Sequence, residues 1–465
     1  MPLSRRALIM SAAATAATAA AASFPFVPSA QPRAALPTGL WRSRSTAEIV
    51  ASGEETWRSY TRYDRALVLV EETAPAEIER EILAIHPDGT DGFELEYWGP
   101  VTRMRYERIH AWPALPRLDG DGDWLSDPGT TVDAFFEVLA GHFAFPAERG
   151  IDWTALRAEC DATLARGAGS PDRLFDALAG ILPHLHDGHG SLRGMRRHAE
   201  SRPAPPRLYR TWKAAGGRSS NRGFSRDFGR DWLFHVQNRI LAGAGRTAAQ
   251  DNVAWGRLPS GVGYVALMLC EDLSEDGSGR TDVAAAVSVF DRVLADLVGA
   301  GGIIVDLRFN YGGWDRVALA LAARFTDDHL PAFTKQAVRS GIPLQPQTIA
   351  VAPAAGPRHT GPVAVLTSDA TISAAEVATL ALRALPNTRS FGRPTYGALS
   401  DPFSYRLPNG WKGTVSNEIY RSVDGQVYEG IGVPPDHPAI EPSPDAVRET
   451  VDIPLRDAEA WILGL

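Results

Sequence analysis

The second half of the chain alternates short apolar segments with longer amphipathic ones. Between residues 279 and 300, the apolar positions Val283, Val287, Phe290, Leu294 and Leu297 are separated by 4, 3, 4 and 3 residues. This is the period of a helix that is buried on one face. Apolar runs at 263–268, 303–307 and 363–366 predict strands, and 317–325 and 373–385 predict further helices. The alternation predicts a layered α/β core over residues 256–465.

The first half of the chain has a different pattern and divides into four further segments. Residues 1–30 read as an export signal, and 31–125 as a small β-rich domain with strands near 66–70 and 93–97. Residues 126–200 show apolar positions at helical spacing. Residues 201–255 are rich in Arg, Gly and Pro and predict an irregular insertion.

The N-terminus has the features of a secretory signal. Arg5 and Arg6 precede an Ala-rich apolar stretch that ends near Ala22. The run 4–9 resembles a twin-arginine export signal, with an ordinary signal that happens to carry two arginines as the alternative. No other stretch approaches 18 uninterrupted apolar residues, so no stable membrane span is expected. We therefore expect an exported protein, periplasmic or extracellular.

Charge and cysteine content exclude several classes of protein. The chain has 47 basic and 55 acidic residues and a net charge of −8, which argues against a nucleic-acid binder. Two cysteines, Cys160 and Cys270, exclude a disulfide scaffold and a cysteine zinc cluster. We expect two buried free thiols, although export would permit a bridge. Only three lysines are present, Lys213, Lys335 and Lys412.

A polar loop at 367–372 leads from a predicted strand to Ser373, which opens a helix. A hydroxyl there lies near the positive end of the helix dipole, and the free amides of the first turn can bind an oxyanion. The alternative is an N-cap, with Glu376 three residues later completing a capping box. On this segment alone, capping is the better interpretation.

The paired glycines Gly312 and Gly313 follow the apolar strand 303–307. Without a Cβ, their backbone amides can approach a ligand closely, so this turn is a candidate for a second oxyanion donor. A simple structural turn is the alternative.

Four segments now resemble, in order, the motifs of one family. They are the Asp-Leu-Arg and Gly-Gly run at 305–313, the serine segment at 373–376, the turn at 392–397 and the closing segment at 428–436. Over roughly 256–440 the chain is similar to the tail-specific (C-terminal processing) peptidases and their tricorn-core relatives. The resemblance implies a ClpP/crotonase-like core of β-β-α units, with Ser373 as the nucleophile of a serine peptidase. The oxyanion would then be held by the amides of Ala374 and of Gly312 or Gly313.

The resemblance also guides the choice of general base. Processing peptidases place a lysine just after the 392–397 turn, where this chain has Ala398, and no lysine is near in sequence. The tricorn-like branch uses a histidine oriented by a glutamate, and His189 and Glu429 match those positions. A histidine can take the serine proton at neutral pH, and a carboxylate would stabilise the imidazolium. Folding could still bring a distant lysine close.

Alternatives for these residues remain open at this point. His184, His186 and His189 could form a metal cluster, His189 could be structural, and Asp187 could be the orienting acid. Asp306 and Arg308 could pair beneath the glycine turn.

The sequence therefore predicts an exported serine peptidase that cleaves a peptide or protein substrate through a Ser-His-Glu triad and an acyl-enzyme, without metal or organic cofactor. A catalytically inactive ligand- or peptide-binding relative and an esterase with the same triad are the alternatives. Residues 201–255 are too short for the PDZ domain of many processing peptidases. Oligomeric state, cleavage preference and the role of the N-terminal domain are left open.

Overall fold

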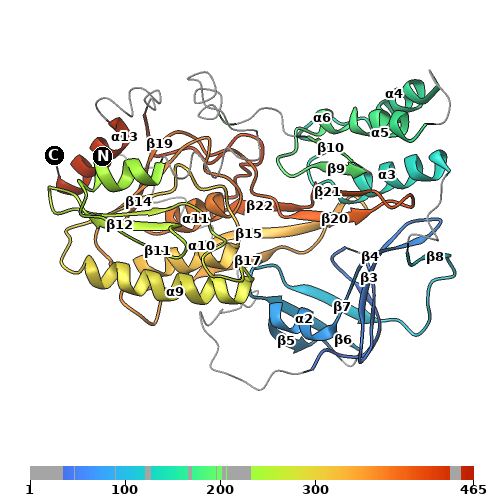
Figure 1. Ribbon diagram of the computed structural model, residues 1–465, viewed down its shortest axis with the longest axis horizontal. Helices are drawn as coiled ribbons and strands as arrows, with labels where there is room; N and C mark the ends of the chain where they lie inside the picture. Colours follow the sequence, from blue (N-terminus) through green and yellow to red (C-terminus); the bar gives the residue numbers. More distant parts are fainter. Residues whose placement is uncertain are drawn as a thin grey trace, which may run out of the picture.

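The structure is a computed structural model that describes residues 35–46, 48–89, 91–120, 127–165, 170–194, 196–201, 206, 232–439 and 452–464. The predicted export signal, Lys213 and most of the predicted insertion 201–255 lie outside these residues. Figure 1 shows an α/β core, an N-terminal sheet below one end of it and a helical region above that sheet. The chain is thus a mixed α/β protein with several sheets.

The core is built on one seven-stranded sheet. In spatial order its strands are β11 (Arg246–Ala248), β12 (Val253–Arg257), β13 (Gly263–Leu267), β14 (Ile303–Asp306), β18 (Val363–Thr367), β19 (Thr388–Gly392) and β23 (His437–Pro438). The strands from β13 to β23 run parallel. The predicted strands at 263–268, 303–307 and 363–366 are confirmed, whereas the predicted start of the core at residue 256 falls inside β12.

Both faces of this sheet are covered, which explains its continuous apolar strands. Val265 and Leu267 pack towards the three helices α9 (Gly279–Asp296), α10 (Asp315–Ala322) and α11 (Ala374–Arg383). Their neighbours Tyr264 and Ala266 pack on the opposite face, towards α13 (Ile453–Leu463). A 3-10 turn, η2 (Ala323–Phe325), ends α10, and a π-helical turn, η1 (Val236–Ile240), lies with α13.

Residues 39–118 form a separate eight-stranded sheet. Its strands are β1 (Gly39–Ser43), β2 (Ile49–Ser52), β3 (Trp57–Arg62), β4 (Leu67–Thr73), β5 (Ile82–Pro87), β6 (Gly92–Tyr97), β7 (Met104–Arg108) and β8 (Arg117–Leu118), with α2 (Pro75–Glu81) between β4 and β5. Trp41, Phe93 and Tyr106 cluster on one face. The predicted strands near 66–70 and 93–97 correspond to β4 and β6.

The helical region contains α3 (Pro128–His142), α4 (Trp153–Ala165), α5 (Pro171–Ala179) and α6 (Leu182–Leu185). It is joined to the core by a four-stranded sheet in the order β10 (Arg197–Glu200), β9 (Ser191–Gly194), β21 (Lys412–Ser416) and β20 (Pro402–Arg406). Because β9 pairs with β21, residues 187–190 are held beside a C-terminal part of the chain.

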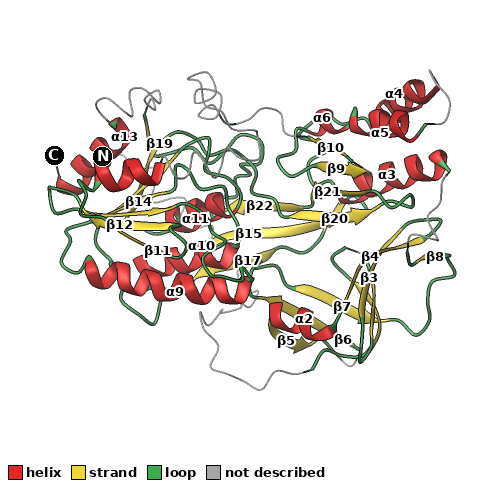
Figure 2. Ribbon diagram, in the orientation of Figure 1, coloured by secondary structure: helices red, strands yellow, loops and turns green. Residues whose placement is uncertain are grey.

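A further sheet was not predicted. The long strand β15 (Leu330–Arg339) pairs with β16 (Ile342–Pro343), β17 (Gln347–Val351) and β22 (Glu418–Ser422). Figure 2 shows β15 and β22 running from the core towards the helical region.

Both cysteines are buried and free, as expected. Within the described ranges, no helix is long and apolar enough to cross a membrane.

Candidate active site

Ser373 has an unusual backbone conformation. It precedes the first residue of α11 with φ 57° and ψ −124°, whereas an ordinary N-cap residue is extended with a negative φ. A non-glycine residue with such angles is strained, and strain of this kind concentrates at functional sites. Ser373 is also partly exposed while Ile372 and Ala374 are buried. The turn therefore presents a single hydroxyl at the end of a buried strand and loop.

Glu376 fixes this turn from beneath. Its carboxylate is fully buried and accepts hydrogen bonds from the amides of Ser373 at 3.1 Å, Gly397 at 2.7 Å and Ala398 at 2.7 Å. It also accepts from the Thr395 hydroxyl at 2.6 Å. The first bond is the carboxylate half of the predicted capping box. Burial raises the pKa of Glu376 to about 7, although these hydrogen bonds oppose the shift.

The glycine turn lies directly against Ser373. A Cβ on Gly312 would lie 2.6 Å from the Cβ of Ser373 and 3.1 Å from the Ala374 amide nitrogen, so only glycine allows this approach. The Gly312 amide donates to Asn310 Oδ1 at 2.9 Å, and Asn310 Nδ2 donates to the Leu267 carbonyl. Among the described residues no hydrogen bond engages the amides of Gly313 and Ala374.

His189 lies in a turn between α6 and β9. Hydrogen bonds to the backbone of His189 hold this turn in place. The Asp187 carboxylate accepts from the His189 amide at 2.9 Å and from the Ser416 amide and hydroxyl. The Thr414 hydroxyl donates to the His189 carbonyl at 2.6 Å. Asp187 thus positions the turn through the His189 backbone.

Glu429 is the second buried carboxylate of the region. Its Oε2 accepts from the amides of Leu399 at 2.8 Å and Ser400 at 3.0 Å. Burial, followed by the nearby carboxylates Glu376 and Asp187, raises the pKa of Glu429 well above its usual range. Glu429 is therefore close to both the serine turn and the histidine turn.

Residues 395–400 contact the turns that carry Ser373 and His189 as well as Glu429 itself. Glu376 binds this segment from the Ser373 turn, and Glu429 binds it from the loop 428–432. The histidine turn contacts it at Gly188, where an added Cβ would overlap the Cβ of Ala398. Ala398 is the position at which the resemblance expected a lysine, and the backbone next to His189 fills the space beside it.

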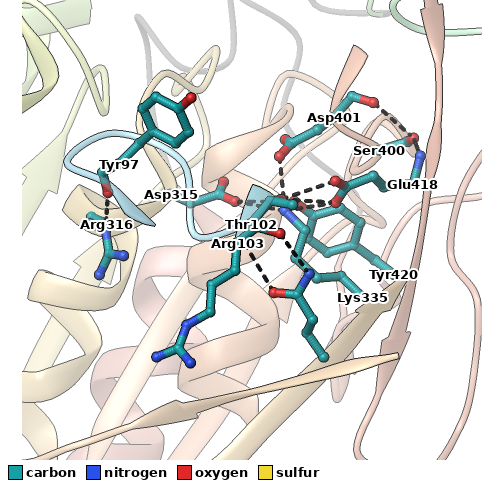
Figure 3. A network of polar contacts seen from close by, with 11 residues as sticks. Tyr97, Thr102, Arg103, Asp315, Arg316, Lys335, Ser400, Asp401, Glu418 and Tyr420 are labelled. Carbon is teal, nitrogen blue, oxygen red and sulfur yellow. Dashed lines mark hydrogen bonds and ion pairs between the residues drawn. The ribbon is translucent and has the colours of Figure 1, made fainter. Parts of the chain in front are cut away.

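Lys335 is buried in a cluster of its own, in the sheet that was not predicted. Its Nζ lies 2.8 Å from Asp401 Oδ2, 2.9 Å from Glu418 Oε2 and 3.8 Å from Asp315 Oδ2. Figure 3 shows these side chains and Tyr420, whose hydroxyl donates to Asp315 at 3.0 Å. Asp315 begins α10, just after the glycine turn.

The charge state of Lys335 follows from these partners. Burial alone would lower the pKa of Lys335, but the carboxylates of Asp401, Glu418 and Asp315 outweigh burial and raise it. Burial raises the pKa of Asp315 to about 7. A lysine base needs the opposite shift, towards the neutral amine. Lys412 is exposed on β21, and Lys213 lies outside the described residues.

The other sequence-based candidates have structural partners. Arg308 and Asp306 form a buried ion pair at 2.7 Å, as expected, and Arg308 also pairs with Asp452 at 2.7 Å. His184 lies 3.4 Å from Glu159. The described part of the chain contains no group of three or more side chains arranged to hold a metal.

Comparison with known proteins identifies the family. Residues 261–439 match the model of peptidase family S41. This range contains the Ser373 turn, the glycine turn and Glu429, but not His189. The chain therefore carries an S41 peptidase domain, and its class is that of a serine-type hydrolase. No curated protein matches the chain.

Solved structures show the same fold. A candidate peptidase from Parabacteroides merdae is 22% identical with a TM-score of 0.57, and the alignment covers 73% of this chain and 98% of that one. Mature CPAF is 11% identical with a TM-score of 0.51, and 72% of this chain and 96% of that one are covered. At these identities the likeness concerns the fold alone.

The sequence did not predict the roles of several residues that position the site. Asn310 was part of a motif, but its hydrogen bond to Gly312 depends on the turn geometry. Thr414 and Ser416 hold the histidine turn from more than 220 residues away. Lys335 lies on a strand with no clear polar alternation, so no local signal marked it.

Proposed function

We propose that this protein is an exported serine peptidase in which Ser373, His189 and Glu429 form the catalytic triad. The observation that carries the proposal is the convergence of their three turns on residues 395–400. The triad goes beyond the family match, since that match does not include His189. The ClpP/crotonase-like class of the core and export by the twin-arginine route belong to the same proposal.

In this mechanism the Ser373 hydroxyl attacks the scissile carbonyl and gives its proton to the His189 imidazole. The resulting tetrahedral oxyanion is held by the Ala374 amide and by the Gly313 amide, because the Gly312 amide already donates to Asn310. The imidazolium then returns its proton to the leaving amine, which departs and leaves an acyl-enzyme. A water then gives a proton to His189 and attacks the acyl carbonyl. The ester bond to Ser373 Oγ breaks, His189 returns the proton to that oxygen, and the acid product leaves. Glu429 orients His189 and stabilises its cation.

A histidine base is favoured over a lysine base by two features of the site. Position 398 carries a methyl group packed against Gly188, so it offers no amine. Lys335 is neutralised by carboxylates and holds its proton. His189, by contrast, lies on a turn whose backbone is fixed by Asp187 and Thr414.

The proposal is tested by labelling the purified protein with a fluorophosphonate probe, which reacts only with an activated serine. We expect labelling of the wild type and its loss in Ser373→Ala and His189→Ala, with circular dichroism showing that both variants are folded. Lys335→Met tests whether Lys335 is the general base. If His189 is the base, the folded fraction of this variant should still be labelled.

Two results would contradict the proposal. Labelling that survives Ser373→Ala would place the nucleophile elsewhere. Labelling that survives His189→Ala but is lost in folded Lys335→Met would replace the triad by a serine–lysine pair. The unlabelled wild-type protein is then assayed with peptide and ester substrates side by side. This comparison distinguishes a peptidase from an esterase.

A further inference from the structure

A large cavity lined by arginines lies between the N-terminal sheet and the strands around β15. Its volume is about 760 Å³, which is within the range of sites that enclose a ligand. Six guanidinium groups line it, from Arg42, Arg44, Arg62, Arg103, Arg105 and Arg339, and Glu107 is the single carboxylate in its lining. This concentration of positive charge is unusual in a chain with a net charge of −8.

The arginines are arranged in rows by the pairing of two strands. β1 and β7 are antiparallel, with Arg42 opposite Glu107. Trp41 and Tyr106 point to the apolar core of the sheet, so their neighbours Arg42 and Arg105 point to the opposite face. Alternate positions on a strand are roughly 6.6 Å apart, and this is also the spacing of alternate side chains in an extended peptide.

Carboxylates hold part of this array in place. Glu107 binds both Arg42 and Arg44, and Glu94 and Glu96 bind Arg105 and Arg103. Glu94 and Glu96 are buried and do not line the cavity, and Asp88 lies 3.8 Å from Arg44. The ion pairs therefore fix the orientation of these guanidinium groups, which lowers the entropy lost when they bind an anion.

Arg62 and Arg339 are different, because neither has an ion pair in the described part of the chain. Arg339 donates to the Arg44 carbonyl at 2.6 Å. Arg62 is exposed, and both arginines also border an adjoining cavity that contains Asp64 and Glu137. On the side facing the large cavity, these two arginines are the cations with the most unused hydrogen-bonding capacity.

Residues 344–349 contribute much of the remaining lining, which is partly polar and partly apolar. It includes the side chains of Gln345, Gln347 and Thr348. Gln347 is partly engaged, since its Oε1 accepts from the Arg103 amide at 3.1 Å. Amide and hydroxyl groups of this kind can bind the backbone of a peptide, whereas a single small anion would contact only one or two of the arginines.

We propose that this arginine-lined cavity binds an extended acidic peptide segment, with Asp or Glu at alternate positions. The inference rests on the proposed peptidase function, because it assigns the cavity to substrates that carry such a segment outside the cleaved bond. Arg62 and Arg339 bind carboxylates directly, and the ion-paired arginines, whose charge their partners largely balance, offer oriented N–H donors.

The cavity is also connected to the catalytic region. Arg103 follows Thr102, whose hydroxyl donates to Glu418 at 3.0 Å. Glu418 belongs to the Lys335 cluster, which includes Asp315 at the end of the glycine turn (Figure 3). A chain of polar contacts therefore links the cavity to the residue that begins the helix after the glycine turn.

The test measures binding separately from cleavage. The full-length Ser373→Ala protein is titrated into a fluorescein-labelled peptide of alternating Glu and Thr, and fluorescence anisotropy is recorded. The matched peptide has Gln in place of Glu. We expect the acidic peptide to bind at least about tenfold more tightly, and added salt to weaken its binding.

A variant pair locates the site. Arg62→Gln with Arg339→Gln, in the Ser373→Ala background, should raise the Kd of the acidic peptide by about tenfold or more. Arg173→Gln with Arg292→Gln removes two exposed arginines of α5 and α9 that do not line the cavity, and should leave the Kd unchanged.

The inference is overturned if the Glu and Gln peptides bind equally, or if both variant pairs weaken binding to the same extent. It is also overturned if inorganic tripolyphosphate binds at these two arginines in preference to the peptide, since the site would then be one for phosphate anions. Fluorophosphonate labelling separates the two proposals. If the protein is labelled but does not bind the peptide, the peptidase proposal stands and the peptide-binding site is wrong. If it binds the peptide but is not labelled, the binding site stands and the peptidase proposal is wrong.

Discussion

Two carboxylate clusters contact residues 395–401, and their carboxylates are stabilised in different ways. On one side, Glu376 and Glu429 accept hydrogen bonds from four successive amides, those of residues 397–400, with no lysine or arginine among the partners of their carboxylates. On the other side, Asp401 and two further carboxylates surround Lys335.

This difference indicates that the two carboxylate clusters have different roles. Backbone amides stabilise a carboxylate but bring no full positive charge, so a cation at His189 would favour the ionised form of Glu429, whose pKa burial otherwise raises. An ion pair with lysine cancels most of the carboxylate charge and fixes the geometry. We therefore assign the amide-held cluster to the chemistry and the lysine-held cluster to the support of β15 and α10.

The largest effect is expected from Glu429→Gln. The Gln carbonyl can still accept from Leu399 and Ser400, so the fold should persist, but a neutral amide cannot stabilise the His189 cation. The rate of fluorophosphonate labelling should fall by about 10³–10⁴-fold. Glu418→Gln, in the lysine-held cluster, is the matched control. Equal losses in the two variants would show that the clusters do not differ in function.

Lys335→Met should mainly affect stability. It leaves the buried carboxylates of Asp315 and Glu418 and the partly exposed one of Asp401 without their cation, which is expected to lower the free energy of unfolding by about 3–5 kcal/mol. Urea denaturation measures this loss. Lys412→Met changes an exposed lysine and should stay within about 0.5 kcal/mol of the wild type. A Lys335→Met protein as stable as the wild type would mean that the cluster does not support the fold.

Glu376 should make stability dependent on pH. Its folded pKa of about 7 lies above the usual 4.5, so its contribution is fully present below pH 4.5 and is lost as the pH rises through 7. The loss amounts to about 3 kcal/mol. In Glu376→Gln, the part of the pH dependence that comes from Glu376 should disappear. The lost hydrogen bonds would change the free energy of unfolding by the same amount at every pH.

The slope is measured by urea denaturation of both proteins at several values between about pH 5 and 8. The Glu429 carboxyl, whose pKa is also raised, contributes with the same sign and remains in the variant. Identical slopes in wild type and Glu376→Gln would show that Glu376 is already ionised throughout this range.

The smallest effect concerns the contact between Gly188 and Ala398. Gly188→Ala places two methyl groups in the same space and should cost about 1–3 kcal/mol of stability, with slower labelling because the His189 turn is displaced. The double variant Gly188→Ala with Ala398→Gly removes the overlap and should recover both properties. No recovery would mean that this contact does not position His189.

Sequence patterns accounted for much of the core. The helix at 279–296 and the strands at 263–267, 303–306 and 363–367 have strong periodicity or continuous apolar runs, and all were predicted within a few residues. β15 and β22 were missed because Lys335 and Glu418 place charged residues of an ionic cluster at buried positions of these strands. Lys335 on β15 is fully buried, and a charged residue at a core position contradicts the pattern of an apolar strand.

The candidate active site likewise has features that local sequence predicts and features that depend on tertiary contacts. The residue types of the site could be read from local sequence: a serine at the start of a helix, paired glycines after a strand, and alanine where a lysine was expected. These are local features, and local chemistry controls them. Tertiary structure alone decided that Gly188 lies on Ala398, that Glu376 and Glu429 share one segment, and that Lys335 is surrounded by carboxylates. Such contacts join residues far apart in the chain, and only the packing of its sheets brings them together.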